Sequence, residues 1–197
     1  FSYLHEEARR SQMSVCIPEP GLLSMHYSAQ EYPSYGTGDY RSPAFSILQE
    51  NGSRVSDFKY RCHEVKSGKP SYLPLPMSYV EKEEEALTLD ITLFDNLSQT
   101  EMVLEYTLYQ DYPILCRNVR FTQKGKEKIF LERAMSMSVE FMDKDFSLLH
   151  LSGAWGRERY LKKRKLEMGI QSIQSLNGTC SGAEHNPFIA LLRKGAD

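Results

Sequence analysis

The sequence lacks any long apolar run, and none of its hydrophobic stretches approaches the roughly 18 residues that a membrane-spanning helix needs. It also lacks an excess of either charge, since 24 lysines and arginines stand against 26 aspartates and glutamates. This balance gives no electrostatic reason to expect a nucleic acid or an anionic membrane as a partner. We therefore expect neither nucleic-acid binding nor membrane insertion.

Cysteine is scarce and scattered. Cys16, Cys62, Cys116 and Cys180 form no Cys-x-x-Cys pair, and this spacing argues against a zinc site, so we expect no bound metal. Cys62 and Cys116 fall in strand-like runs, where a small, buried, reduced side chain is the simplest interpretation. Reduced cysteines favour a cytoplasmic location.

Sequence motifs of common enzymes are missing as well. The chain has no Gly-x-Ser-x-Gly elbow, no Walker loop, no dinucleotide-binding fingerprint and no zinc-protease helix. A glycosidase needs two carboxylates facing each other across the scissile bond, and no spacing among the acidic residues singles out such a pair. We therefore expect no catalytic residue and no cofactor in this chain.

What the sequence does contain is apolar alternation with a period of two. Turn sequences separate the alternating segments, and no segment places apolar residues three and four apart, as a helix would. In 87–93 the leucines and the isoleucine are expected to face the core, and the threonines and Asp90 the solvent. Asn51-Gly52 predicts a hairpin. The predicted strands cover 45–47, 58–62, 87–93, 102–108, 115–121, 129–131 and 135–141.

Short strands separated by turns at roughly 8–12-residue spacing are typical of an antiparallel sandwich or barrel. Two facing sheets bury the apolar side of half-buried strands, so we expect an all-β fold, a large antiparallel β-sandwich. It is predicted as a single domain over 1–197 with an irregular leader over 1–30. Both ends resemble cuts in a longer chain, and the sandwich is expected to lack its last strands.

Two segments interrupt the alternation. In 35–43 two glycines flank a threonine, which lets the backbone approach another surface closely, and Asp39 and Arg41 bracket Tyr40. A carboxylate, a guanidinium and an aromatic ring suit a sugar, and an internal salt bridge that holds the loop is the alternative interpretation.

The second segment, 151–159, contains the only tryptophan, Trp155, between two small residues. This ring is interpreted as a sugar platform, as an anchor at an interface or as part of the core. The basic run 157–165 that follows predicts a solvated strand or loop face.

These segments, with others in the same order along the chain, make the sequence recognisable. It resembles the N-terminal domain of the α-galactosidases of glycoside hydrolase family 36, which cleave raffinose and melibiose. The matching stretches are EYPSYGTGDYRSPA at 31–44, LQENGSRV at 48–55, LPMSYVE at 75–81, LTLDITL at 87–93, LSGAWGRER at 151–159, GIQSI at 169–173 and NPFIA at 186–190. The family often has alanine where this chain has Gly156.

The resemblance implies a large β-sandwich that precedes a (β/α)₈ barrel. The nucleophile and the acid/base of the retaining mechanism are aspartates of that barrel, and its Lys-Trp-Asp motif has no counterpart in this chain. Family members assemble as tetramers in which this domain lies over the barrel mouth of a neighbouring subunit. The resemblance therefore makes Arg10, Asp39 and Arg41 candidate contacts to galactoside or to that subunit.

Three functions remain open at this point. The first is a non-catalytic sandwich domain that shapes the active-site entrance of a retaining α-galactosidase and supports its homo-oligomer. The second is a free-standing carbohydrate-binding module. The third is a purely structural assembly domain without sugar contact.

Overall fold

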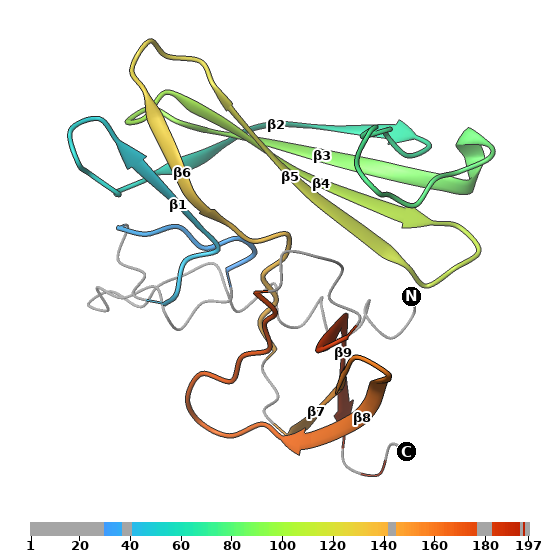
Figure 1. Cartoon of the computed structure of the whole chain (residues 1–197). Helices are drawn as coiled ribbons and strands as arrows, with labels where there is room; N and C mark the ends of the chain where they lie inside the picture. Colours follow the sequence, from blue (N-terminus) through green and yellow to red (C-terminus); the bar gives the residue numbers. More distant parts are fainter. Residues whose placement is uncertain (1–29, 37–40, 142–144, 177–182, 194, 196–197) are drawn as a thin grey trace. The chain divides into compact units, whose positions relative to one another are not determined.

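The computed structural model describes residues 30–36, 41–141, 145–176, 183–193 and 195. They fall into two compact units, which divide after Glu140. The strands are antiparallel, which confirms the all-β prediction (Figure 1). Among these residues no helix has the length and apolar character to cross a membrane. The elements are β1 (Phe45–Gln49), β2 (Phe58–Ser67), the 3₁₀ helix η2 (Glu83–Glu85), β3 (Ala86–Asp95), β4 (Thr100–Tyr109), β5 (Leu115–Gln123), β6 (Ile129–Ala134), β7 (Phe146–Ala154), β8 (Arg157–Lys165) and β9 (His185–Arg193).

The leader predicted over 1–30 lies outside the described residues except for Gln30. The prediction of one domain over 1–197 stays a prediction, and the two units are described separately below.

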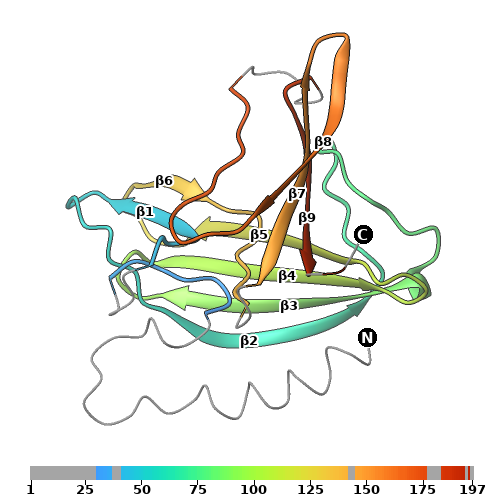
Figure 2. The ribbon, with the colours of Figure 1, turned by 90° about the horizontal axis from the view of Figure 1, so that it is seen from below.

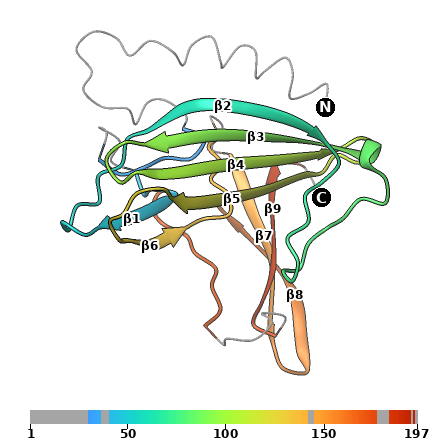
Figure 3. The same ribbon diagram turned by 90° about the horizontal axis from the view of Figure 1, so that it is seen from above.

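The first unit contains two sheets. Strands β2, β3, β4 and β5 form a meander of four neighbouring antiparallel strands, which run side by side in Figure 3. Strands β1 and β6 pair with each other in a separate two-stranded sheet. A bulge interrupts the β1–β6 register after Ser46.

The core of this unit lies between the two sheets. Phe45 and Ile47 of β1 are buried against Met102 and Leu104 of β4. The Phe45 ring contacts three other aromatic rings with centroid separations of 5.3 to 5.5 Å, from Tyr32, Phe58 and Phe121. Alternating apolar residues on β1 and on β4 therefore meet as the sandwich prediction requires.

The turn predicted at Asn51-Gly52 forms, but the hairpin predicted there is wrong. The Gly52 amide donates to the Gln49 carbonyl at 2.9 Å, and the Ser53 amide donates to the Asn51 side chain at 2.9 Å. However, β1 pairs with β6, and β2 pairs with β3, so this turn carries the chain from one sheet to the other. A turn sequence determines a local reversal and leaves the pairing partner open.

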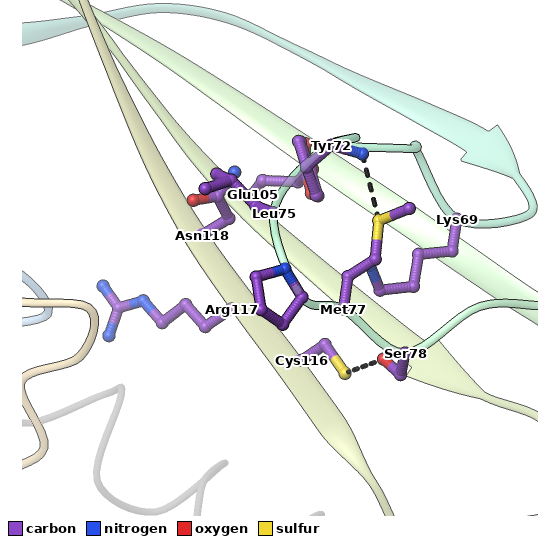
Figure 4. A pocket seen from close by; sticks show the side chains of 10 residues that line it. Lys69, Tyr72, Leu75, Met77, Ser78, Glu105, Cys116, Arg117 and Asn118 are labelled. Atoms are coloured by element: carbon purple, nitrogen blue, oxygen red, sulfur yellow. Dashed lines mark hydrogen bonds between the residues drawn. The ribbon is translucent and has the colours of Figure 1, made fainter. Parts of the chain in front are cut away.

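The solvent face predicted for β3 is also wrong at its start. Leu87 is 56% exposed, whereas Thr88 is fully buried. The Thr88 hydroxyl donates to the Gly68 carbonyl at 2.7 Å and lies 2.8 Å from the Thr107 hydroxyl across the strand pair. Asp90 is buried as well and accepts from Lys66 at 2.9 Å. The segment that joins β2 to β3 lies over this face (Figure 4) and contributes the Gly68 carbonyl that accepts from Thr88, whereas one carboxylate oxygen of Asp90 has no hydrogen-bond partner among the described residues.

Two further expectations fail. Residues 135–141 form no strand, because β6 ends at Ala134 and the next carbonyls accept from side chains instead, Met135 from Tyr32 and Ser138 from Arg117. The two described cysteines are free thiols, as expected for reduced residues. They are not buried, however, since Cys62 is exposed and Cys116 is half-buried. Cys16 and Cys180 lie outside the described residues.

The second unit is a three-stranded antiparallel sheet in the order β8-β7-β9 (Figure 2). Segment 151–159 is the hairpin between β7 and β8, with a bulge at Gly153, where a Cβ would lie 2.2 Å from the Arg157 carbonyl oxygen. The basic run forms β8 and is exposed throughout, as predicted. Pro187 is tolerated in β9 because that strand lies at the sheet edge.

A histidine on the central strand of this sheet predicts a pH dependence. His150 is buried, and its ring centroid lies 5.9 Å from that of His185. Burial lowers the pKa of His150, and the positive charges of Arg164 and Lys162 on β8 add to the effect. The unfolded chain therefore binds this proton at a higher pH than the folded chain does.

We expect the melting temperature to fall as the pH drops below about 6.5, the ordinary pKa of histidine. Above this pH, protonation of His150 should make no contribution to the melting temperature. Thermal unfolding of the wild-type chain and of His150→Gln between about pH 5 and pH 8 measures this difference. A decline of equal size in the variant would show that other groups are responsible.

Candidate functional site

Segment 30–44 contains the predicted loop, and the structure describes it on both sides of 37–40. Its two arms are joined to each other, and to residues just outside β2 and β6, by backbone hydrogen bonds. The Ala44 amide donates to the Pro33 carbonyl at 2.9 Å, and the Ala44 carbonyl accepts from Met135 at 2.8 Å. The Ser56 amide donates to the Tyr35 carbonyl at 3.2 Å. Both arms of the segment are therefore fixed to the first unit.

Gly36 has the close approach that the glycines of this loop predict. Its φ is +100°, a conformation that side chains other than glycine rarely adopt. A Cβ at this position would also lie 2.9 Å from the methyl groups of Val55. Glycine is therefore required here by the chain's own packing.

Arg41 forms an ion pair with Glu140, at the end of the same unit. The other carboxylate oxygen of Glu140 accepts from the Gln30 amide at 3.4 Å. Arg133 donates to the Ser42 hydroxyl at 3.0 Å. The sequence left two interpretations of this segment open, a sugar contact and an internal salt bridge that holds the loop. Arg41 does form an ion pair within the chain, and its partner is Glu140.

A second cationic group, Arg117 on β5, holds the other arm. Its side chain is almost fully buried and forms an ion pair with Glu31 at 3.1 Å. It also donates to the carbonyls of Ser138 at 3.2 Å and Glu31 at 3.4 Å. The rings of Tyr32 and Tyr106 lie 5.3 and 5.0 Å from the guanidinium carbon. One guanidinium thus joins three segments that are distant in sequence.

The two tyrosines beside Arg117 stay protonated and act as hydrogen-bond donors. Burial, followed by the hydrogen bond to Glu31, raises the pKa of Tyr106, whose hydroxyl lies 2.8 Å from that carboxylate. Burial also raises the pKa of Tyr32, while the charge of Arg117 opposes the shift. Tyr32 donates to the Met135 carbonyl.

A pocket of about 300 Å³ lies between this segment and the four-stranded sheet. Its lining is apolar toward the sheet and polar toward the segment, an arrangement that ligand sites share. The lining residues are Gln30, Glu31, Tyr32, Ser34, Phe45, Asp57, Phe58, Leu93, Met102 and Leu104.

Trp155 lies at the turn of the β7–β8 hairpin in the second unit. Its side chain is 91% exposed, so it is not part of the described core. The following Gly156 has a φ of +75°, and its amide donates to the Glu158 carboxylate at 2.7 Å. A large aromatic ring exposed on a tight turn agrees with the sugar-platform and the interface interpretations alike.

Of the other candidates, Arg10 and Asp39 lie outside the described residues, so their roles stay predictions. Arg41 belongs to the first unit and Trp155 to the second. Within the described part of the chain, no three or more histidine, cysteine, aspartate or glutamate side chains are grouped as a metal site would require.

Sequence reasoning missed Arg117 and Glu140. A signal existed for Arg117, because it stands in the apolar row of its predicted strand, between Leu115 and Val119. A cation in such a row needs a partner once it is buried. Glu140 carries no comparable signal.

The family of the chain follows from its similarity to known proteins. Residues 3–197 match the Glycosyl hydrolase family 36 N-terminal domain. The chain belongs to this family.

Among its relatives is alpha-galactosidase AgaA of Geobacillus stearothermophilus, with 46% identity over 180 residues. That match covers 91% of this chain and 25% of the enzyme. Alpha-galactosidase Mel36A of Lactobacillus acidophilus is 36% identical over 163 residues, which cover 83% of this chain and 22% of the enzyme. The chain therefore spans about a quarter of the length of these family 36 relatives.

Solved structures agree with this assignment. The crystal structure of AgaA matches with a TM-score of 0.85 and 45% identity, over 91% of this chain and 26% of that chain. A variant of AgaA crystallised in complex with raffinose matches with a TM-score of 0.84 over the same shares. The all-β architecture is thus that of the N-terminal region of family 36 α-galactosidases.

Proposed function

We propose that the chain is the non-catalytic N-terminal domain of a retaining α-galactosidase that hydrolyses terminal α-galactosides such as melibiose and raffinose. The observation that carries the proposal is the joint match of sequence and fold, 45% identity at a TM-score of 0.85, to an α-galactosidase. A (β/α)₈ barrel in the same protein performs the chemistry, and this domain shapes the active-site entrance and supports a cytoplasmic homotetramer.

The geometry of segment 30–44 supports the entrance role. Both of its described arms are fixed, one by Arg117 and the other by Glu140. Preorganised contacts lose less entropy on binding than mobile ones. Arg41 and Asp39 are the proposed contacts in this segment, and Arg10 and Trp155 are the proposed contacts elsewhere.

Assay of the full-length protein with raffinose tests the proposal. We expect it to release galactose, and we expect residues 1–197 alone to release none. We further expect Arg41→Ala to lower kcat/KM about 10- to 100-fold, the loss that follows from removing one hydrogen bond to a charged group.

Arg54→Ala is the matched control, because Arg54 is also an arginine of the first unit in an ion pair, with Glu132 at 2.8 Å. Its kinetics should equal those of the wild type. Unchanged kinetics of Arg41→Ala in an intact oligomer would leave only the structural assembly role. Saturable heat on titrating residues 1–197 alone with galactose would favour the carbohydrate-binding module.

A further inference from the structure

A separate pocket of about 310 Å³ lies beneath the segment that joins β2 to β3. In Figure 4 this segment arches over β4 and β5, and its side chains face those of the two strands. The Tyr72 amide donates to the Met77 sulfur at 3.0 Å, and the Ser78 hydroxyl lies 3.3 Å from the Cys116 thiol. The pocket volume is at the lower end of the roughly 300–1,000 Å³ usual for ligand sites.

The floor of this pocket holds a buried carboxylate. Glu105 of β4 is only 4% exposed, and across the strand pair it faces Asn118 of β5. In the described part of the chain no hydrogen bond or ion pair satisfies its carboxylate. Burial raises the pKa of Glu105, and the charges of Arg120 and Lys69 oppose that shift. A carboxylate that lines a pocket and has no partner in the protein accepts a hydrogen bond from a donor group that binds there.

The walls carry a second unsatisfied group. The Tyr72 hydroxyl is buried and has no hydrogen-bond partner among the described residues. Lys69 lies over the Tyr72 ring at 5.0 Å and forms no ion pair in the described structure. Leu75 and Met77 add apolar surface to the lining. Donors, acceptors and apolar atoms therefore surround one small volume.

The charges of this lining define the ligand class. Lys69 and Glu105 carry one charge of each sign, and Figure 4 shows the Arg117 side chain pointing away from the pocket, so the lining is neutral overall. A neutral lining favours a neutral ligand, and isolated acceptors and donors suit hydroxyl groups, which serve as both. We propose that this pocket binds a neutral polyhydroxylated molecule of monosaccharide size. This site goes beyond the proposed galactosidase function and does not depend on it.

The reactivity of Cys116 measures whether the pocket is occupied, because Cys116 lines the pocket and Cys62 does not. The full-length protein is treated with iodoacetamide with and without D-glucose, and the labelling rate of each cysteine is measured by peptide mass spectrometry. At about four times the dissociation constant, the labelling of Cys116 should fall about fivefold, because only the unoccupied fraction reacts. The exposed Cys62 should react at an unchanged rate.

Glu105→Leu removes the buried acceptor and should abolish the protection of Cys116. Glu101→Gln changes a half-buried carboxylate of the same strand, paired with Lys124 at 3.1 Å, and should leave protection intact. A crystal of the full-length protein soaked with D-glucose should show the sugar beside Glu105. The proposal would be overturned if that crystal showed only water beside Glu105, or if D-glucose protected both cysteines equally. It would also be overturned if ethanolamine protected Cys116 and D-glucose did not. Activity on raffinose is scored separately, so failure of one proposal leaves the other standing.

Discussion

Replacing Phe45 with alanine is expected to lower the free energy of unfolding by about 3–5 kcal/mol. Phe45 is 1% exposed and contacts three aromatic rings from different segments of the first unit. Its removal leaves a cavity between the two sheets, and the surrounding β-strands are too constrained to collapse into it. Urea titration of the purified chain, followed by circular dichroism, measures the change.

Phe130→Ala is the matched control. Phe130 lies on β6, the partner strand of β1, and is 61% exposed. Its replacement should change the free energy of unfolding by no more than about 0.5 kcal/mol. Equal losses for the two variants would mean that Phe45 does not occupy the core.

Arg117→Leu is expected to destabilise the chain by about 2–4 kcal/mol, because it removes a charged hydrogen-bond donor and two cation–π contacts at a buried position. Arg117→Lys should lose roughly half as much, since an ammonium keeps the charge but lacks the planar fork that reaches two carbonyls. Urea titration again gives the free energies. Hydrogen exchange of the Ala44 amide should accelerate in both variants, because segment 30–44 loses its anchor.

Arg120→Leu provides the comparison for this series. Arg120 lies three residues further along β5, where it is exposed. Its loss should leave the exchange of the Ala44 amide unchanged. If Arg117→Leu proved as stable as the wild type, the burial of its guanidinium would have no energetic consequence.

The strands β1 to β6 could be predicted from the sequence because the apolar period is local, whereas β7 and β9 were not predicted and 135–141 forms no strand. Phe45 and Ile47 share a face, as do Met102 and Leu104, and both pairs reach the core. The strand β8 was also predictable, since a run of basic residues is stable only in solvent.

Which face of a strand is covered could not be predicted in every case. Alternation groups Leu87 with one face and Thr88 with the other, but burial depends on what packs there. The segment between β2 and β3 covers the face of β3 that carries Thr88, and nothing in the sequence of β3 itself predicts this cover. For the same reason, Asn51-Gly52 predicted a turn correctly and its pairing wrongly.

The candidate site divides in the same way. The sequence by itself determined that 31–44 is unlike the strands around it, and its composition and motif identified a family. Only the tertiary structure decided what holds that segment, because the partners of its charges are remote: Arg41 and Glu140 stand 99 positions apart. Local periodicity encodes backbone geometry, whereas the pairing of buried charges depends on which distant segments the packed sheets bring together.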